Sequence, residues 1–178
     1  MDPVFWHSAA ASLAAVLLIG AQAKLREQEI FRGAIDAYRL VPQAAVAPLA
    51  LLLPLVEAVT GGLLLVTSTR ALGAALAIAL LLLVTGAVAV NLRRGRDRID
   101  CGCGGEIHTP LSLGLVARNA VLMGLALVAA APPTPPRATN GLDLFAIAAS
   151  TLFLLGLYSV ATTLLSHQPR LNDLRKNA

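Results

Sequence analysis

Charged and aromatic residues are scarce in this chain of 178 residues. Only 13% of the residues are charged and 4% are Phe, Trp or Tyr, whereas 57% are hydrophobic. So little charge excludes a soluble protein of ordinary composition. It also excludes a nucleic-acid partner, because the Lys and Arg residues stand between apolar runs, where they report membrane topology. The chain is therefore predicted to be an integral membrane protein surrounded by the lipid bilayer.

Motifs for nucleotide and metal sites are missing as well. The chain contains no G-x-x-x-x-G-K-[ST], no H-E-x-x-H and no C-x-x-C, which leaves few places for chemistry. Its two cysteines, Cys101 and Cys103, are separated by one glycine and lie in the main polar break between the apolar runs. Two thiols this close are expected to act as a unit.

Five apolar segments are long enough to cross a bilayer, which takes about 20 helical residues. These runs lack the alternation of a β-barrel, so we predict an all-α bundle in a single domain. The predicted spans are 4–23, 43–69, 71–92, 110–131 and 142–165, followed by a polar basic tail at 166–178. Residues 24–39 are predicted to form an amphipathic interfacial helix. Thr109 and Pro110 are predicted to open the fourth span as its N-cap and first helical residue.

The distribution of Lys and Arg predicts the orientation. Eleven of the 14 lie after the first span, in the cysteine loop or in the tail, and the two other loops hold Arg70 and Arg137. The positive-inside rule then places the N-terminus outside and the C-terminal tail in the cytoplasm. The cysteine loop is expected at the cytoplasmic end of a multi-pass protein of the inner (cytoplasmic) membrane.

The spacing of the two cysteines favours a reversible disulfide. A ring closed over one glycine is small and strained, so its disulfide is easier to reduce than a relaxed one. It also restrains the unfolded chain too little to act as a staple. Neighbouring positive charge favours the reactive thiolate. The residues expected to support Cys101 and Cys103 are Asp100, Arg94, Arg96, Arg98, Arg118 and Glu57.

Two other interpretations of the cysteine loop stay open. Cys101, Cys103 and His108 are alternative ligands for zinc or Cu(I), which would make the chain a soft-metal binding or transport protein. A loop without chemistry would instead belong to a non-catalytic membrane assembly subunit. Whether the protein is itself an enzyme is not decided by the spacing.

Glu57 is the one charged residue between Leu40 and Thr69. A carboxyl group deep in the membrane costs roughly 3 kcal/mol, so Glu57 is expected to face the bundle interior and to have a partner or a proton. It either orders the helices through a polar contact or takes part in proton movement or cofactor binding. Arg118 is expected either to snorkel to the interface or to turn towards the thiols, and its depth does not pair it with Glu57.

Six short stretches together resemble a known family. They are Lys24-Leu25, Tyr38-Arg39-Leu40-Val41-Pro42, Pro54-Leu55-Val56-Glu57, Asn91-Leu92-Arg93-Arg94-Gly95-Arg96, Asp100-Cys101-Gly102-Cys103 and Arg118-Asn119. Over about residues 24–131 the chain resembles the MauE methylamine-utilisation membrane proteins, within the broader DoxX-like redox-associated group. Gly104 departs from the aromatic residue expected after the second cysteine, which weakens the link to methylamine.

The resemblance implies a five-span bundle that supports disulfide formation, or maturation of the small subunit of methylamine dehydrogenase. It also implies a periplasmic thioredoxin-like partner, whereas the basic residues place the cysteine loop inside. Two hypotheses reconcile these expectations. Either the pair folds into the bundle and becomes accessible to opposite faces in turn, passing electrons from a cytoplasmic thiol donor, or it exchanges electrons with a membrane quinone, the candidate cofactor. We therefore predict a membrane thiol–disulfide redox protein that reacts through Cys101 and Cys103.

Overall fold

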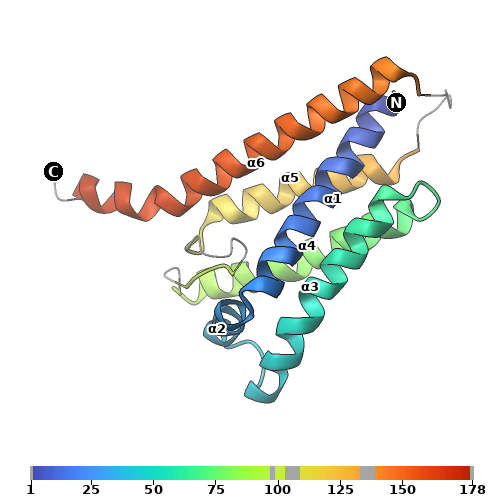
Figure 1. Cartoon of the computed structure of the whole chain (residues 1–178). Helices are drawn as coiled ribbons and strands as arrows, with labels where there is room; N and C mark the ends of the chain where they lie inside the picture. Colours follow the sequence, from blue (N-terminus) through green and yellow to red (C-terminus); the bar gives the residue numbers. More distant parts are fainter. Residues whose placement is uncertain (1, 97–98, 103–108, 133–138, 177–178) are drawn as a thin grey trace.

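The computed structural model describes residues 2–96, 99–102, 109–132 and 139–176, with side chains as far as His167. Within these ranges the chain forms six helices and no strand (Figure 1). They are α1 (Pro3–Arg26), α2 (Gln28–Tyr38), α3 (Gln43–Leu65), α4 (Arg70–Arg93), α5 (Leu113–Ala130) and α6 (Gly141–Lys176). All but α2 are long and apolar enough to cross a membrane. This confirms the predicted all-α membrane bundle with five spans.

Local signals set the ends of the first two helices. The Asp2 carboxylate accepts a hydrogen bond of 2.8 Å from the Val4 amide and so caps α1. The chain breaks at Glu27 and continues as α2, which ends where Arg39 adopts a left-handed conformation with φ of 49°. Because α2 is short and starts directly after α1, it stays at the end of the bundle from which α3 departs (Figure 1).

Small side chains set the packing of the spanning helices. Ala10 and Ala14 of α1, Ala74 and Ala77 of α4 and Ala126 of α5 are buried members of one hydrophobic cluster, which also contains several leucines. Close approach of helices through small residues is the main source of packing energy where lipid competes with apolar side chains. The result is a bundle in which α1 contacts α3, α5 and α6, while α4 contacts α3 and α5.

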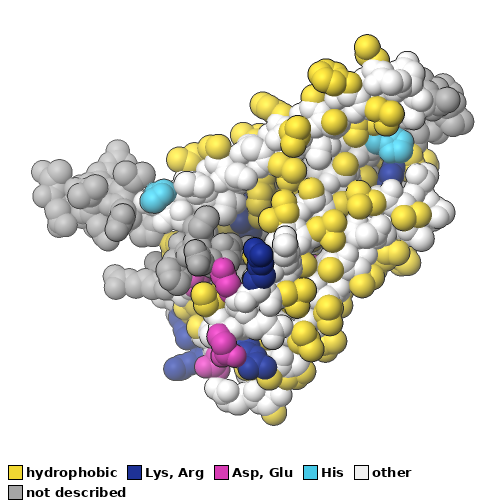
Figure 2. All heavy atoms as spheres, in the orientation of Figure 1, with side chains coloured by type: hydrophobic (Ala, Val, Ile, Leu, Met, Phe, Trp, Pro, Cys, Tyr) yellow, Lys and Arg dark blue, Asp and Glu magenta, His cyan; other side chains and the backbone are white. Residues whose placement is uncertain are grey.

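The outer surface is apolar along the helices and charged at one end. Figure 2 shows hydrophobic side chains along the flank of the bundle and most of the visible charged side chains at the end where α2 lies. The exposed Phe145 and Phe153 of α6 extend this apolar surface. Such a surface suits contact with lipid rather than with water.

The one basic residue described at the opposite end is buried. Arg70, at the start of α4, is 4% exposed, and its guanidinium carbon lies 4.1 Å from the centroid of the Trp6 ring. Its Nε donates to the Leu64 carbonyl oxygen at 3.0 Å, and its Nη1 lies 3.3 Å from Nδ1 of His7. In the part of the chain that the structure describes, exposed basic side chains therefore do not occur at this end.

The start of the fourth span was predicted wrongly. Thr109 and Pro110 do not open a helix, since α5 begins at Leu113 with Ser112 as its N-cap. Pro110 instead pairs with Asp100 in an isolated antiparallel bridge. The backbone at 109–111 forms hydrogen bonds with the other arm of the cysteine loop, from the Cys101 amide to the Thr109 carbonyl oxygen and from the Leu111 amide to the Ile99 carbonyl oxygen. Because these groups are already paired, the helix begins only after them. At the other end of the second span, α3 stops at Leu65 rather than at Thr69.

Candidate functional site

Cys101 is a buried member of the protein core. It is 7% exposed and belongs to a buried cluster with Val88, Leu111, Leu115 and Leu165. It is disulfide-bonded, and none of the cysteines in the described ranges is free. Cys103, the second cysteine of the chain, lies outside the described residues. The sulfur of Cys101 therefore faces the bundle interior rather than water.

Backbone hydrogen bonds hold this cysteine in place. The Cys101 amide donates to the Thr109 carbonyl oxygen at 2.8 Å, which ties the two arms of the loop together. Oδ1 of Asp100 accepts from the amides of Gly102 at 3.0 Å and Thr109 at 3.3 Å. Asp100 was predicted to support the cysteine pair, and the structure gives it this organising position in the loop.

Gly102 lets the loop lie directly on α2. Its φ of +68° is in the left-handed region that favours glycine. A Cβ at this position would come within 2.9 Å of the Ala34 Cβ and 3.2 Å of Cδ2 of Phe31. A glycine is thus needed between the two cysteines for two reasons: the backbone has a positive φ, and a larger residue would clash with α2.

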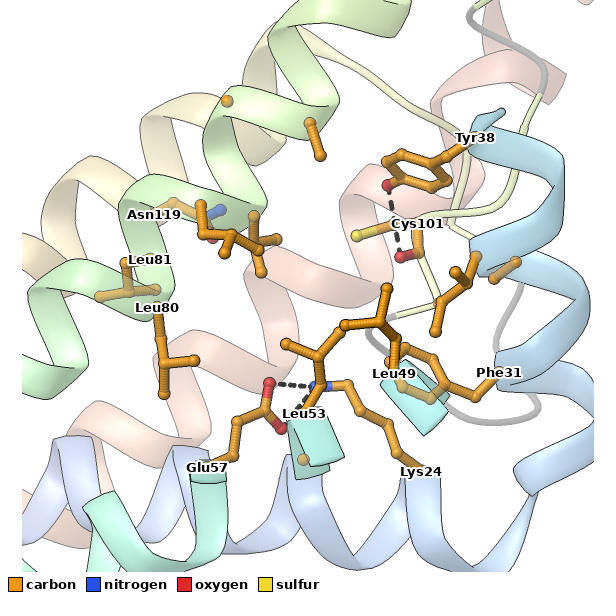
Figure 3. Close-up of a pocket in the computed structure, with 18 of the residues that line it drawn as sticks. Lys24, Phe31, Tyr38, Leu49, Leu53, Glu57, Leu80, Leu81, Cys101 and Asn119 are labelled. Atoms are coloured by element: carbon orange, nitrogen blue, oxygen red, sulfur yellow. Dashed lines mark hydrogen bonds and ion pairs between the residues drawn. The ribbon is translucent and has the colours of Figure 1, made fainter. Parts of the chain in front are cut away.

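Tyr38, the last residue of α2, closes the loop from the other side. Its hydroxyl donates to the Cys101 carbonyl oxygen at 3.4 Å (Figure 3), and its own carbonyl oxygen accepts from Nη1 of Arg96, also at 3.4 Å. Burial raises the pKa of Tyr38 well above its usual value, and the negative charge of Asp100 raises that pKa further. The phenol therefore remains protonated and able to donate to Cys101.

The ionisation of Tyr38 is a measurable consequence. The chain has two tyrosines, so in a Tyr158→Phe variant the ultraviolet absorbance of tyrosinate reports Tyr38 alone. We expect no ionisation near pH 10 in the folded protein and ordinary ionisation near about pH 10 after unfolding in denaturant. Since the folded pKa is the higher one, this contribution to stability is complete below about pH 10 and is lost as the pH rises towards the folded pKa. Ionisation of the folded variant near pH 10 would contradict the burial of Tyr38.

A cavity of about 450 Å³ lies beside Cys101. Its walls are mainly leucines, valines and alanines from all six helices (Figure 3). Besides Cys101, its polar and charged lining residues are Lys24, Tyr38, Glu57, Arg118, Asn119 and Tyr158. An apolar cavity with a few convergent polar groups is the usual form of a small-molecule site.

The Lys24–Glu57 ion pair forms one wall of the cavity. Nζ of Lys24 lies 2.6 Å from both carboxylate oxygens of Glu57, and the two side chains are only 11% and 10% exposed. The expected inward orientation of Glu57 is what the structure shows, but its partner was missed. Lys24 was counted with the interfacial segment, although it belongs to the last turn of α1.

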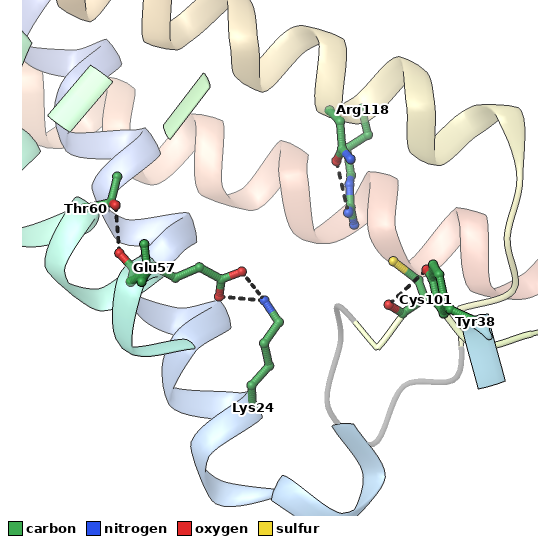
Figure 4. A network of polar contacts seen from close by, with 8 residues as sticks. Lys24, Tyr38, Glu57, Thr60, Cys101 and Arg118 are labelled. Atoms are coloured by element: carbon green, nitrogen blue, oxygen red, sulfur yellow. Dashed lines mark hydrogen bonds and ion pairs between the residues drawn. The ribbon is translucent and has the colours of Figure 1, made fainter. Parts of the chain in front are cut away.

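Arg118 of α5 turns inward to the same cavity. Its Nη2 donates to Oδ1 of Asn119 at 3.4 Å, and its guanidinium carbon lies 5.3 Å from the centroid of the Tyr158 ring. Nε and Nη1 are buried without a hydrogen-bond partner among the described residues. Figure 4 shows the Cys101 sulfur pointing away from Tyr38, towards the side on which Arg118 and the ion pair lie.

The other predicted supporting residues lie farther from the cavity or outside the described ranges. Arg94 is exposed, and Arg96 donates to Tyr38 and to Oδ1 of Asn91 at 3.4 Å. Arg98, Cys103 and His108 are not among the described residues. Two of the three alternative metal ligands are thus beyond what the structure describes, and the residues that it does describe contain no group of three metal-ligating side chains.

Sequence comparison identifies the relatives of this chain. The sequence model of the family described as methylamine utilisation protein MauE matches residues 2–132. The chain belongs to the MauE family. It is 43% identical over 126 residues to the methylamine utilization protein MauE of Methylophilus methylotrophus and 42% identical over 157 residues to that of Paracoccus versutus. These matches cover 71% and 86% of this chain.

The match spans different shares of the MauE relatives. It covers 84% of the Paracoccus versutus protein, 65% of the Methylophilus protein and 64% of the Paracoccus denitrificans protein, which is 43% identical. The chain thus spans slightly less than two thirds of the length of two of them. No solved structure matches the chain.

The stretches that carry the MauE resemblance meet at the cavity. Every one of them except 91–96 contributes lining residues, although they lie on different helices. The lining residues from these stretches are Lys24, Tyr38, Leu40, Val41, Glu57, Cys101, Gly102, Arg118 and Asn119. The fold therefore assembles the motifs of this MauE-family chain into one site.

Proposed function

We propose that this MauE-family protein is a membrane thiol–disulfide redox protein in which Cys101 and Cys103 form a reversible disulfide. The observation that carries the proposal is that Cys101 is disulfide-bonded and buried in the wall of a cavity inside the bundle. A disulfide over so short a loop contributes little as a staple. Its place beside a cavity with charged groups suits electron exchange instead.

The proposed exchange is a two-electron transfer between proteins. A thiolate of a partner attacks the Cys103 sulfur, the bond to Cys101 breaks, and Cys101 leaves as a thiolate. A second partner thiolate then attacks the mixed disulfide, so that the partner is oxidised and the pair becomes a dithiol. We assign the attacked sulfur to Cys103 because Cys101 is enclosed by Tyr38 and α2. The positive charge of Arg118 at the same cavity favours the Cys101 thiolate.

The relatives suggest the process that this exchange serves. They are named for methylamine utilisation, and we propose the same process for this chain. The client would be an extracytoplasmic protein with disulfides, of the methylamine dehydrogenase small-subunit type. The direct partner would be a periplasmic thioredoxin-like protein or a cytoplasmic thiol donor.

We also propose an orientation in the inner membrane with the N-terminus outside and the C-terminus in the cytoplasm. The basic residues of the described loops lie at the cysteine end, on α2 and after α4, whereas Arg70 at the far end is buried. Under the positive-inside rule, this asymmetry puts the cysteine loop on the cytoplasmic side. A membrane-impermeant maleimide should then label the reduced protein in lysates and not in intact spheroplasts.

Thiol trapping in cells tests the redox proposal. We expect the wild-type pair to occur in both oxidised and reduced forms after acid quenching and alkylation. The Cys101→Ser variant keeps Cys103 and should capture a partner as an adduct that reductant releases. The Cys103→Ser variant keeps only the buried Cys101 and should capture far less, which makes it the matched control.

Three outcomes would point elsewhere. A pair that is always reduced, with no adduct in either variant, would contradict the redox proposal. Stoichiometric zinc or copper that is lost in both variants would favour metal binding. A double Cys→Ser protein that still supports maturation of the client would indicate a non-catalytic assembly subunit.

A further inference from the structure

The cavity beside Cys101 reaches the lipid-facing surface of α4. Leu83, Gly86 and Val90 line the cavity and are also exposed on the outside of the bundle. Their spacing of three and four residues puts them on one face of the helix. A Cβ added to Gly86 would meet no atom within 4 Å. These three positions mark a path from the hydrocarbon layer into the cavity.

The inner wall of the cavity offers hydrogen-bond donors. Nε and Nη1 of Arg118 are buried with no acceptor among the described residues, and a buried donor without an acceptor is costly. The Lys24 ammonium lies on another wall, paired with Glu57. The ligand that fits such a cavity is apolar, enters from the bilayer and carries acceptor oxygens for Arg118.

We propose that this cavity binds a membrane quinone, which oxidises the dithiol form of the Cys101–Cys103 pair. A quinone has a flat apolar ring with two carbonyl acceptors, and its tail can pass out between the residues at the mouth. A volume of about 450 Å³ lies in the range of small-molecule sites. The inference rests on the proposed redox function and names the electron acceptor for that same site.

The reaction balances without a further reactant. The two thiols give up two electrons and two protons and form one S–S bond. The quinone takes up both electrons and two protons, and its carbonyl oxygens become hydroxyls. Because the quinol diffuses within the bilayer, it can leave the cavity and be replaced by another quinone.

The test uses the full-length protein in lipid nanodiscs, with the pair reduced and the reductant removed. A ubiquinone analogue with a decyl tail is added, and quinol and disulfide are both measured over time. We expect one quinol per pair. Gly86→Leu fills the mouth without displacing any atom near the Cβ, and it should slow the reaction about tenfold or more. Gly62→Leu on α3 is the matched control, since Gly62 is equally open and does not line the cavity.

A second variant tests binding without turnover. Arg118→Gln in the oxidised protein should raise the Kd of the quinone analogue about tenfold or more, because Gln lacks the forked donors of arginine. Unchanged binding in Arg118→Gln, equal rates in the two glycine variants, or a wild-type dithiol that the quinone does not oxidise would overturn the quinone site.

A parallel assay separates this inference from the redox proposal. Glutathione disulfide, a water-soluble oxidant, is offered to the same reduced samples. If the pair is oxidised by glutathione disulfide and not by the quinone, the redox function stands and the quinone site is wrong. If neither oxidant converts the pair to a disulfide, both proposals fail.

Discussion

Replacing Glu57 by Gln is expected to destabilise the folded protein by about 3–5 kcal/mol, because the Lys24 ammonium would remain buried without its counter-charge. The two carboxylate oxygens lie 2.6 Å from Nζ, and both side chains are about nine-tenths buried. The ammonium is therefore largely shielded from solvent. Equilibrium unfolding in mixed micelles with increasing detergent denaturant measures the loss.

Two controls make this prediction specific to the buried pair. Glu29 and Arg32 form an exposed pair at 3.2 Å on α2, and Glu29→Gln should cost less than about 1 kcal/mol. The double variant Lys24→Gln with Glu57→Gln removes both charges and should recover most of the lost stability. Equal effects of Glu57→Gln and Glu29→Gln, or a double variant as unstable as the sum of the single ones, would show that the ion pair does not stabilise the bundle.

The ion pair is also connected to the cysteine loop. Nζ of Lys24 lies 5.6 Å from the centroid of the Phe31 ring, and Phe31 is one of the two residues on which Gly102 rests. A change at Glu57 is therefore expected to affect the packing of α1 and α2 and, through the contact of α2 with Gly102, the position of Cys101. We expect slower disulfide exchange in Glu57→Gln even under conditions in which the variant is fully folded.

Gly102→Ala is expected to cost about 2–4 kcal/mol and to impair disulfide exchange, because strain and overpacking act together. The added Cβ meets the Ala34 Cβ at 2.9 Å, so the loop must move away from α2 or α2 must shift. Either movement displaces the hydrogen bond from Tyr38 to the Cys101 carbonyl oxygen. Unfolding measurements and the rate of exchange with glutathione report the two effects separately.

Gly95 provides the matched control for this substitution. Its φ of +69° is nearly the same as that of Gly102, but no atom lies within 4 Å of an added Cβ. Gly95→Ala should therefore show the backbone strain alone, about 1–2 kcal/mol. Ala34→Gly combined with Gly102→Ala removes the closest clash and should recover part of the difference. If Gly95→Ala and Gly102→Ala behave alike, the loop is not seated on α2 as the structure shows.

The prediction of Glu57 illustrates how far sequence reasoning reaches. The cost of a lone carboxyl in an apolar run depends only on its depth, so the inward orientation of Glu57 could be predicted. Its partner could not, since Lys24 is 33 residues away and stands among other basic residues. Which cation reaches the carboxylate depends on how α1 and α3 pack against each other, and this packing brings together residues that are far apart in the sequence.

Thr109 and Pro110 show where reasoning from the local sequence fails. Their local pattern favours a helix start, and in isolation it is a sound signal. In the folded chain the Thr109 carbonyl oxygen accepts from Cys101 and Pro110 pairs with Asp100. A contact across the loop overrides local propensity here, and such a contact leaves no periodic trace in the sequence.

The sequence alone determined the close spacing of the two cysteines, the five apolar spans and the unequal distribution of basic residues between the loops, because spacing, length and charge act locally. Only the tertiary structure decided that Cys101 is buried, that Tyr38 and Gly102 seat it on α2, and that Lys24, Glu57 and Arg118 share its cavity. These contacts join residues far apart in the chain. They depend on how closely the small residues of α1, α4 and α5 let the helices approach.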